Sequence, residues 1–209
     1  MVVKSKQPAR PSGPALAYGP ETRSRIRTGD ILLFQGRGPL SRLIRWGSKS
    51  AYSHVGMAAW WNARLVVLQA AGRGVEVLPV SRAVHEYDGQ VDWYTLAADV
   101  DARLDRERLF HVAVDQLGTP YATVSLLELM WRMLLGAFRW TPDPKVEPEA
   151  IFCSQYVSYC YREAGLDLRE DTEDACTSPG DLAVCGLLRL MGVLHRPEAS
   201  DRAEAIAAE

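Results

Sequence analysis

The chain has 209 residues, enough for one compact domain with a full hydrophobic core but few for two. Hydrophobic residues make up 47% of it and charged residues 24%, the proportions of an ordinary soluble globular protein. Its 24 basic and 26 acidic residues leave a formal net charge of −2. Because phosphate binding needs a concentrated basic excess, this balance argues against nucleic acid as a partner.

The N-terminal residues, the hydropathy pattern and the cysteines argue against several further classes of protein. Residues 1–24 contain scattered basic residues and prolines but no apolar run of signal-peptide length, which predicts a disordered or loosely attached arm. No run is apolar enough to predict a membrane-spanning helix, so a reducing cytoplasm is the expected location. The cysteines lack the close Cys-x-x-Cys spacing of a zinc site and the density of a disulfide scaffold: Cys153, Cys160, Cys176 and Cys185.

The first half of the chain predicts mainly strands. The turn Thr28-Gly29-Asp30 precedes a compact apolar run that is typical of a buried strand. Leu40, Leu43 and Ile44 have helical spacing, which predicts a short helix that ends at Gly47. The expected strands are Ile31–Phe34, His54–Trp61, Arg64–Ala71, Val75–Val80 and Val91–Leu96, with a hairpin turn at Asn62-Ala63.

The second half predicts mainly helices. The apolar segment Tyr121–Phe138 is either a buried helix or one that contacts lipid or an acyl chain. The other expected helices are Asp101–Leu117, Glu149–Ala164 and Leu182–Leu194. The prediction is therefore an α+β fold, a small antiparallel sheet packed against helices, in one domain over residues 25–196 followed by a frayed tail over 197–209.

Cys153 is the strongest candidate for chemistry. It follows a Pro-rich loop and lies in the first turn of an expected amphipathic helix. There the helix dipole and unpaired N–H groups favour the thiolate, which is the nucleophilic state, and the same groups can form an oxyanion hole. A buried thiol that only packs as a small hydrophobic residue is the alternative.

A nucleophilic cysteine needs a base, and His54 is the best placed of the four histidines. It begins a strand directly after a polar loop, whereas His85 is expected in a loop, His111 within a helix and His195 near the C-terminus. Gln69 is the polar residue of the next strand and should lie beside His54. We expect its amide oxygen to accept the Nδ1 proton, which would leave Nε2 as the base.

Several motifs together resemble one family. Gly29–Phe34, Arg45-Trp46-Gly47, Tyr52–Met57, Gly118–Tyr121, Phe152–Val157 and Ser178–Leu182 resemble the circularly permuted papain-like (YiiX/YaeF-like) branch of the NlpC/P60 cysteine hydrolases. The resemblance implies Cys153 as nucleophile, His54 as general base and Gln69 as orienting residue, with no metal or cofactor. Many relatives look acidic at the last position, so a neutral Gln69 would stabilise an imidazolium less well. We also expect substrate contacts from Tyr121, Ser53 and Ser154.

The predicted function is a cysteine hydrolase, an amidase or peptidase or an esterase or acyltransferase, working through a thiol acyl-enzyme. Its substrate would be a small-molecule, lipid-like or peptide acyl compound, which includes peptidoglycan-type substrates. Two alternatives stay open: a catalytically weak or inactive binding module on the same fold, and an interaction protein that contacts a membrane or partner through residues 121–138.

Overall fold

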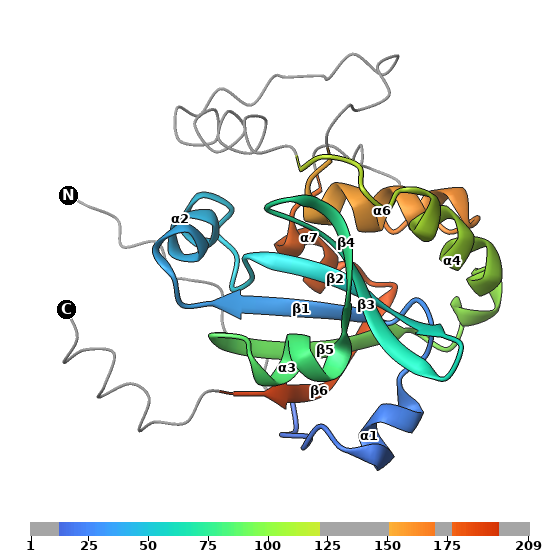
Figure 1. Ribbon diagram of the computed structural model, residues 1–209, viewed down its shortest axis with the longest axis horizontal. Coiled ribbons are helices and arrows are strands. Elements are labelled where there is room, and N and C mark those ends of the chain that lie inside the picture. The colour runs from blue at the N-terminus through green and yellow to red at the C-terminus, as the bar shows by residue number, and fades with distance from the viewer. Residues whose placement is uncertain (1–12, 122–150, 170–176, 197–209) are drawn as a thin grey trace.

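The computed structural model describes residues 13–121, 151–169 and 177–196. Its centre is a six-stranded antiparallel sheet in the order β4-β3-β2-β1-β5-β6 (Figure 1). The strands are β1 (Ile31–Gly36), β2 (His54–Trp61), β3 (Arg64–Ala71), β4 (Gly74–Pro79), β5 (Gly89–Leu96) and β6 (Leu188–His195). The predicted α+β class with an antiparallel sheet is confirmed.

Helices cover both faces of this sheet. They are α1 (Pro20–Arg25), α2 (Pro39–Gly47), α3 (Val80–His85), α4 (Arg106–Asp115), α6 (Cys153–Glu163) and α7 (Pro179–Val184), with a 3-10 turn, η1, at Asp101–Arg103. Successive strand residues alternate between two cores: Leu33 packs with α4 and α6, whereas Leu32 and Phe34 pack with α3 on the opposite face (Figure 1).

Strand β1 lies in the middle of the sheet, and all six of its residues are buried. Asp30, just before it, is buried too, and its carboxylate accepts hydrogen bonds from Trp93 Nε1 at 2.8 Å and Thr95 Oγ1 at 2.7 Å on β5. Burial raises the pKa of the Asp30 carboxyl above its usual value. The turn before β1 is therefore tied to the neighbouring strand by a buried polar group whose partners satisfy it.

The hairpin of β2 and β3 has the predicted bounds. Asn62 has a φ of 53°, the left-handed conformation that asparagine tolerates in tight turns. The next turn, Gly72-Arg73, is also two residues long, because Ala71 pairs with Gly74. This register places Gln69 directly opposite Glu76.

The structure of the last apolar segment differs from the one predicted. We expected one helix over Leu182–Leu194, but the chain forms the short helix α7 and then the edge strand β6. Ser178 and Asp181 form a capping box at the start of α7, which the sequence motif contains. The remaining apolar residues pair with β5, which offers a free sheet edge, so tertiary pairing overrides a pattern that suits either structure.

Three other segments differ from expectation. Residues 80–85 form α3, so His85 ends a helix and does not lie in a loop. The helix expected over 101–117 divides into η1 and α4, with Asp105 capping α4 through the Arg108 N–H at 2.9 Å. Within the expected arm, residues 20–25 form α1 and Ala15 pairs with Val193; residues 1–12 and the expected tail lie outside the described residues.

The apolar helix expected over residues 121–138 also falls outside the described residues, except for Tyr121, which pairs with Ile151. Among the described helices, none combines the length and apolarity that crossing a bilayer requires.

Candidate active site

Cys153 is the first residue of α6, the helix that packs on β2 and β3 (Figure 1). Phe152 is extended, so the helix begins at the cysteine itself and not at Glu149 as predicted. Two hydrogen bonds fix this end of the helix: Ser154 Oγ donates to the Thr177 carbonyl at 2.6 Å, and Tyr156 Oη donates to the Ala113 carbonyl at 2.8 Å. The sulfur is thus held at the positive end of an eleven-residue helix.

The Cys153 thiol lies against the imidazole of His54. His54 begins β2 opposite Phe34, the position to which the antiparallel register of β1 and β2 brings it. Burial raises the pKa of the thiol. The charge and hydrogen bond of His54, together with hydrogen bonds from the backbone N–H groups of Val55 and Ser154, lower this pKa by more than burial raises it. The net pKa of Cys153 therefore lies below the usual thiol value, which favours the thiolate.

The same pairing acts on His54 in the opposite direction. Burial lowers the pKa of the imidazole, whereas the thiolate of Cys153 and the hydrogen bonds to Cys153 and Gln69 raise it. The result is a pKa above the usual histidine value. The lowered thiol pKa and the raised imidazole pKa both favour the thiolate–imidazolium form of the pair over its neutral form.

The hydrogen bond between Gln69 and His54 involves Nε2 of the ring and not the predicted Nδ1. Gln69 Oε1 lies 2.9 Å from His54 Nε2, so Nδ1 is the nitrogen that remains for the sulfur. The prediction that Gln69 would hold Nδ1 is wrong because the Gln69 strand lies on the side of the ring that carries Nε2. The sequence places Gln69 on the neighbouring strand but contains no information on the ring's rotation.

Glu76 is a neighbour that the sequence reasoning missed. Its Oε1 accepts a hydrogen bond of 3.0 Å from Gln69 Nε2, and the two residues face each other across β3 and β4. The two-residue turn at Gly72-Arg73 was the signal that would have found it, because a tight turn fixes the register of the strands that it joins.

Two tyrosines interact with Cys153, Tyr121 through a hydrogen bond and Tyr87 through the charge of the thiolate. The phenol of Tyr121 hydrogen-bonds with Cys153, and burial raises its pKa above the usual value, as do the charge and hydrogen bond of Cys153. Burial likewise raises the pKa of Tyr87 to about 12, although its hydrogen bond with Ser53 lowers it. Both phenols therefore stay neutral at physiological pH, and the Tyr121 phenol can donate a hydrogen bond to the thiolate.

The two serines expected to contact substrate have protein partners. Ser53 Oγ accepts from the Gly36 N–H at 3.1 Å, and the Ser154 hydroxyl is engaged by Thr177. Both side chains are buried. The structure thus places Tyr121 at the sulfur and uses the hydroxyls of Ser53 and Ser154 to hold the backbone around it.

The remaining histidines and described cysteines lie elsewhere in the fold. His111 is exposed on α4 beside Glu107, His85 ends α3 and His195 ends β6. Cys153, Cys160 and Cys185 are buried, and none of these described cysteines forms a disulfide; Cys176 is outside the described residues.

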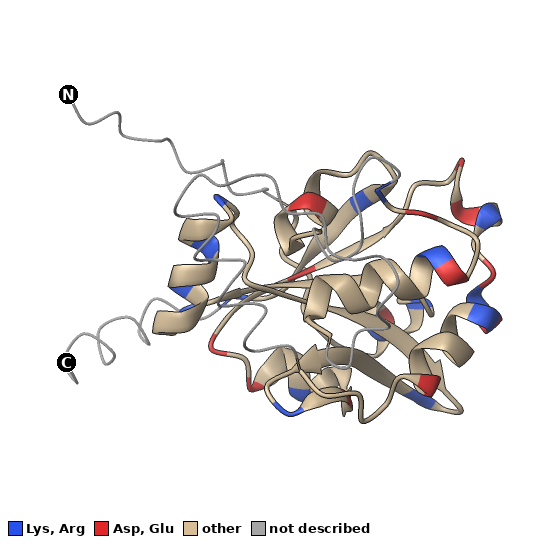
Figure 2. Ribbon diagram, turned by 90° about the horizontal axis from the view of Figure 1, so that it is seen from above, with Lys and Arg blue, Asp and Glu red and all other residues tan. Residues whose placement is uncertain are grey.

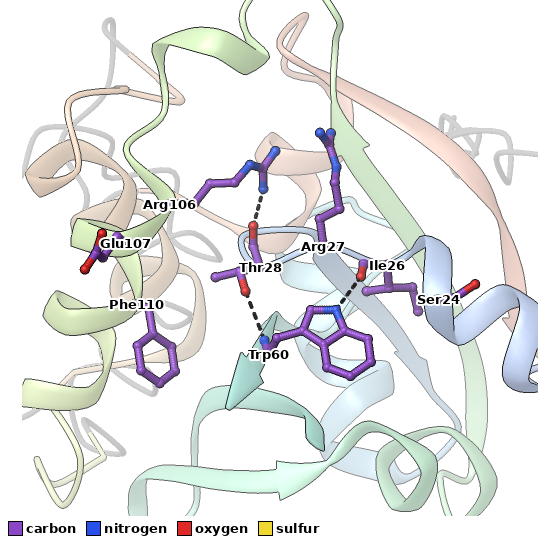
Figure 3. Close-up of a pocket in the computed structure, with 8 residues that line it drawn as sticks. All are labelled: Ser24, Ile26, Arg27, Thr28, Trp60, Arg106, Glu107 and Phe110. Atoms are coloured by element: carbon purple, nitrogen blue, oxygen red, sulfur yellow. Dashed lines mark hydrogen bonds between the residues drawn. The ribbon is translucent and has the colours of Figure 1, made fainter. Parts of the chain in front are cut away.

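A surface pocket of about 470 Å³ lies at the other end of β2 from His54 (Figure 3). Its polar groups bind one another: Trp60 Nε1 donates to the Ile26 carbonyl at 2.8 Å, and the Trp60 N–H donates to Thr28 Oγ1 at 3.0 Å. Arg27 and Arg106 both bind Asp101. The pocket contains none of the candidate catalytic residues, which lie at the start of β2 and α6.

Comparison with known proteins places the chain in a family. Residues 25–128 match the family described as the permuted papain-like amidase enzymes, YaeF/YiiX, C92 family. The chain belongs to this permuted papain-like family. The matched residues include His54 and Gln69 and end before Cys153, so the cysteine is assigned from geometry and sequence motif. A comparison with curated proteins gives no match.

A solved relative has the same fold as this permuted papain-like chain. The structure described as metalloprotein YiiX from Escherichia coli O157:H7 superposes with a TM-score of 0.57 at 20% identity, covering 83% of this chain and 98% of that one. Within the residues described here, no three His, Cys, Asp or Glu side chains gather in an arrangement that could hold a metal ion.

Proposed function

We propose that this member of the family hydrolyses an amide through a thiol acyl-enzyme formed on Cys153. The observation that carries the proposal is the buried contact between the Cys153 thiol and the His54 imidazole, with its opposed pKa shifts. Family membership supports cysteine hydrolase chemistry, and the geometry supplies residues for each step.

The proposed reaction begins with attack of the Cys153 thiolate on the substrate carbonyl carbon. The negative oxygen of the tetrahedral intermediate is stabilised by N–H groups of the first turn of α6, foremost that of Cys153. His54 then gives its Nδ1 proton to the leaving amine as the carbon–nitrogen bond breaks. In the second half, His54 takes a proton from water, which hydrolyses the thioester and releases the acid.

Gln69 keeps the ring in position during these transfers. Its Oε1 accepts the Nε2 proton, so Nδ1 is the nitrogen that exchanges a proton with sulfur, leaving group and water. Tyr121 is proposed to donate its phenolic hydrogen bond to the thiolate or to the bound acyl group. Esters fit the same scheme, since their leaving group also needs a proton and the acyl-enzyme is identical.

Alkylation of Cys153 at different pH values tests the proposal. Because the thiol pKa is lowered, the thiolate persists as the pH falls below about 8.5, where an ordinary thiol is protonated. We expect iodoacetamide to modify Cys153 at pH 6–7 at least about tenfold faster than it modifies the same cysteine in the denatured chain. Mass spectrometry of the Cys153 peptide gives the rate; a native rate no higher than the denatured one contradicts the proposal.

A further inference from the structure

Gln69, which hydrogen-bonds with His54, is a neutral amide, and its neighbours explain how the site works with it. An amide presents an oxygen on one side and an NH₂ group on the other. An ionised carboxylate can only accept hydrogen bonds, so Glu76 requires the NH₂ end of Gln69, at 3.0 Å. The oxygen of Gln69 must then face His54, as it does at 2.9 Å.

We infer that Glu76 is a positioning residue of the active site, acting through Gln69 to fix the His54 tautomer and to supply the negative charge that the amide lacks. Without Glu76 the Gln69 amide can turn over and present its NH₂ group to Nε2. That group needs an unprotonated Nε2, which would leave the neutral ring with its proton on the side of the sulfur and block its use as a base.

The charge of Glu76 adds to this geometric effect. Hydrogen bonds in a chain polarise one another, so a carboxylate at one end makes Gln69 Oε1 a stronger acceptor for the imidazolium proton. In this series of hydrogen-bonded groups, Glu76 is separated from His54 by Gln69 alone, whereas the sulfur lies beyond His54. The charge of Glu76 contributes to the raised pKa of His54. It therefore favours the thiolate–imidazolium pair over the neutral pair.

The surroundings leave this charge available. Glu76 is half-buried, and in the described part of the chain it forms no ion pair within 4.0 Å. The charge of Glu76 acts on Arg82 of α3, but Arg82 is paired with Glu86 at 2.8 Å. On the other side of the pair, the phenols Tyr87 and Tyr121 remain neutral at physiological pH.

Exchanging the charge between positions 76 and 69 tests the inference, which rests on the proposed function. The readout is the pH dependence of Cys153 alkylation by iodoacetamide, which needs no substrate. We expect Glu76→Gln to slow alkylation at pH 7 about three- to tenfold, because the imidazolium loses a charged partner. Adding Gln69→Glu to Glu76→Gln puts the carboxylate directly on Nε2 and should restore the rate. Glu107→Gln, at an exposed carboxylate on α4, is the control for net charge.

Each outcome separates this inference from the proposal beneath it. If wild-type Cys153 reacts fast and Glu76→Gln matches Glu107→Gln at every pH, the role of Glu76 is refuted and the hydrolase proposal stands. A slowed single variant that Gln69→Glu fails to restore, at an unchanged melting temperature, also refutes it. If wild-type Cys153 reacts no faster than the denatured thiol, there is no ion pair to support and both ideas fail.

A separate observation concerns α2, which turns its apolar residues towards solvent, unlike most surface helices. Leu40, Leu43 and Trp46 are 55%, 41% and 63% exposed, and no residue of α2 is buried. Its polar Ser41 instead lies against the sheet, where a Cβ on Gly36 would meet the Ser41 hydroxyl at 2.3 Å. A helix usually turns its apolar face inward, so an outward apolar face indicates a surface that is covered when the protein is at work.

The charges on α2 indicate what covers it. Its charged residues, Arg42 and Arg45, are basic, and Lys49 follows in the next loop; Figure 2 shows no acidic residue on this helix. From position 31 to position 75 the sequence contains no Asp or Glu. Apolar residues with Trp on one face and basic residues on the other are the features of helices that lie in the surface of anionic membranes.

We propose that α2 docks on an anionic lipid surface, with Leu40, Leu43 and Trp46 entering the interface and Arg42 and Lys49 facing the headgroups. The helix follows β1 and leads to the loop before His54, and the charges of Arg45 and Cys153 both act on the Tyr87 phenol. Docking would therefore bring the surface that adjoins the active site against the lipid. This proposal holds whether or not Cys153 is catalytic.

Co-sedimentation of the full chain with vesicles tests the docking. We expect binding to phosphatidylcholine vesicles that contain about a third phosphatidylserine, and at least about tenfold weaker binding to phosphatidylcholine alone. Leu40→Ser/Leu43→Ser/Trp46→Ser should abolish binding, whereas Val184→Ser, at a 77% exposed apolar residue of α7, should not. Binding that the triple variant retains refutes the proposal, as does no preference for the anionic vesicles. A wild-type dimer that the triple variant loses, without vesicle binding, assigns the face to a second copy.

Discussion

Replacing Cys153 with serine is expected to lower amide turnover by about a thousandfold or more, the size of effect that removal of an activated nucleophile has. A hydroxyl has a much higher pKa than a thiol, so His54 cannot hold it ionised in the ground state. Serine is nearly isosteric with cysteine, and the site already contains hydrogen-bonding partners for a hydroxyl. We therefore expect the melting temperature to change by no more than a few degrees.

Cys160 provides the matched control for this variant. It lies two turns further along the same face of α6, is fully buried and contacts Tyr156 in the core. Cys160→Ser makes the same chemical change in the same helix and should leave turnover within about twofold. Turnover is measured on a panel of amide and ester substrates. Equal losses in both variants, or a large fall in the melting temperature of Cys153→Ser alone, would indicate that Cys153 has a packing role.

Removal of the imidazole is the second large effect. His54→Ala should lower turnover by about 10²- to 10⁴-fold, because general acid–base transfer is lost at both the leaving group and the water. It should also raise the pKa of Cys153, since the charge and hydrogen bond of His54 oppose the effect of burial. With the thiol pKa raised, less thiolate is present at pH 6–7, and alkylation of Cys153 should slow accordingly.

His111→Ala serves as the control, because His111 is exposed on α4 and its pairing with Glu107 at 4.0 Å lies at the surface. It should change neither turnover nor alkylation. If His54→Ala leaves the alkylation rate at pH 6–7 unchanged, the reactivity of Cys153 comes from the helix terminus and the N–H groups of Val55 and Ser154. The imidazole would then be a neighbour and not the base.

The two variants test different parts of one geometry. Cys153→Ser tests whether the Cys153 sulfur forms the bond to the substrate carbonyl carbon. His54→Ala tests whether the imidazole is what ionises that sulfur. The alkylation profile links them, because it reports the ionisation without requiring a known substrate. The alkylation measurements can therefore precede the search for a substrate.

Local sequence patterns determined most of the elements. Alternation and a tight Asn62-Ala63 turn predicted β2 and β3 with their bounds, because a two-residue turn and buried alternating faces leave one register. The motifs around Cys153, His54 and Gln69 placed a thiol at a helix start and two polar residues on adjacent strands. Those are short-range properties of the chain, and the family resemblance that they carried is confirmed.

Tertiary structure alone decided how those residues face one another. The apolar run over 188–195 suits a helix or a strand, and the free edge of β5 decided for a strand. Several features of the site depend on side-chain rotation and on segments far apart in sequence. They are the ring nitrogen that binds Gln69, the carboxylate of Glu76 behind Gln69, and the phenol of Tyr121 that hydrogen-bonds with Cys153. A sequence records the chemical groups and their spacing, but the direction of a hydrogen bond is set by the packed neighbours on each side of it.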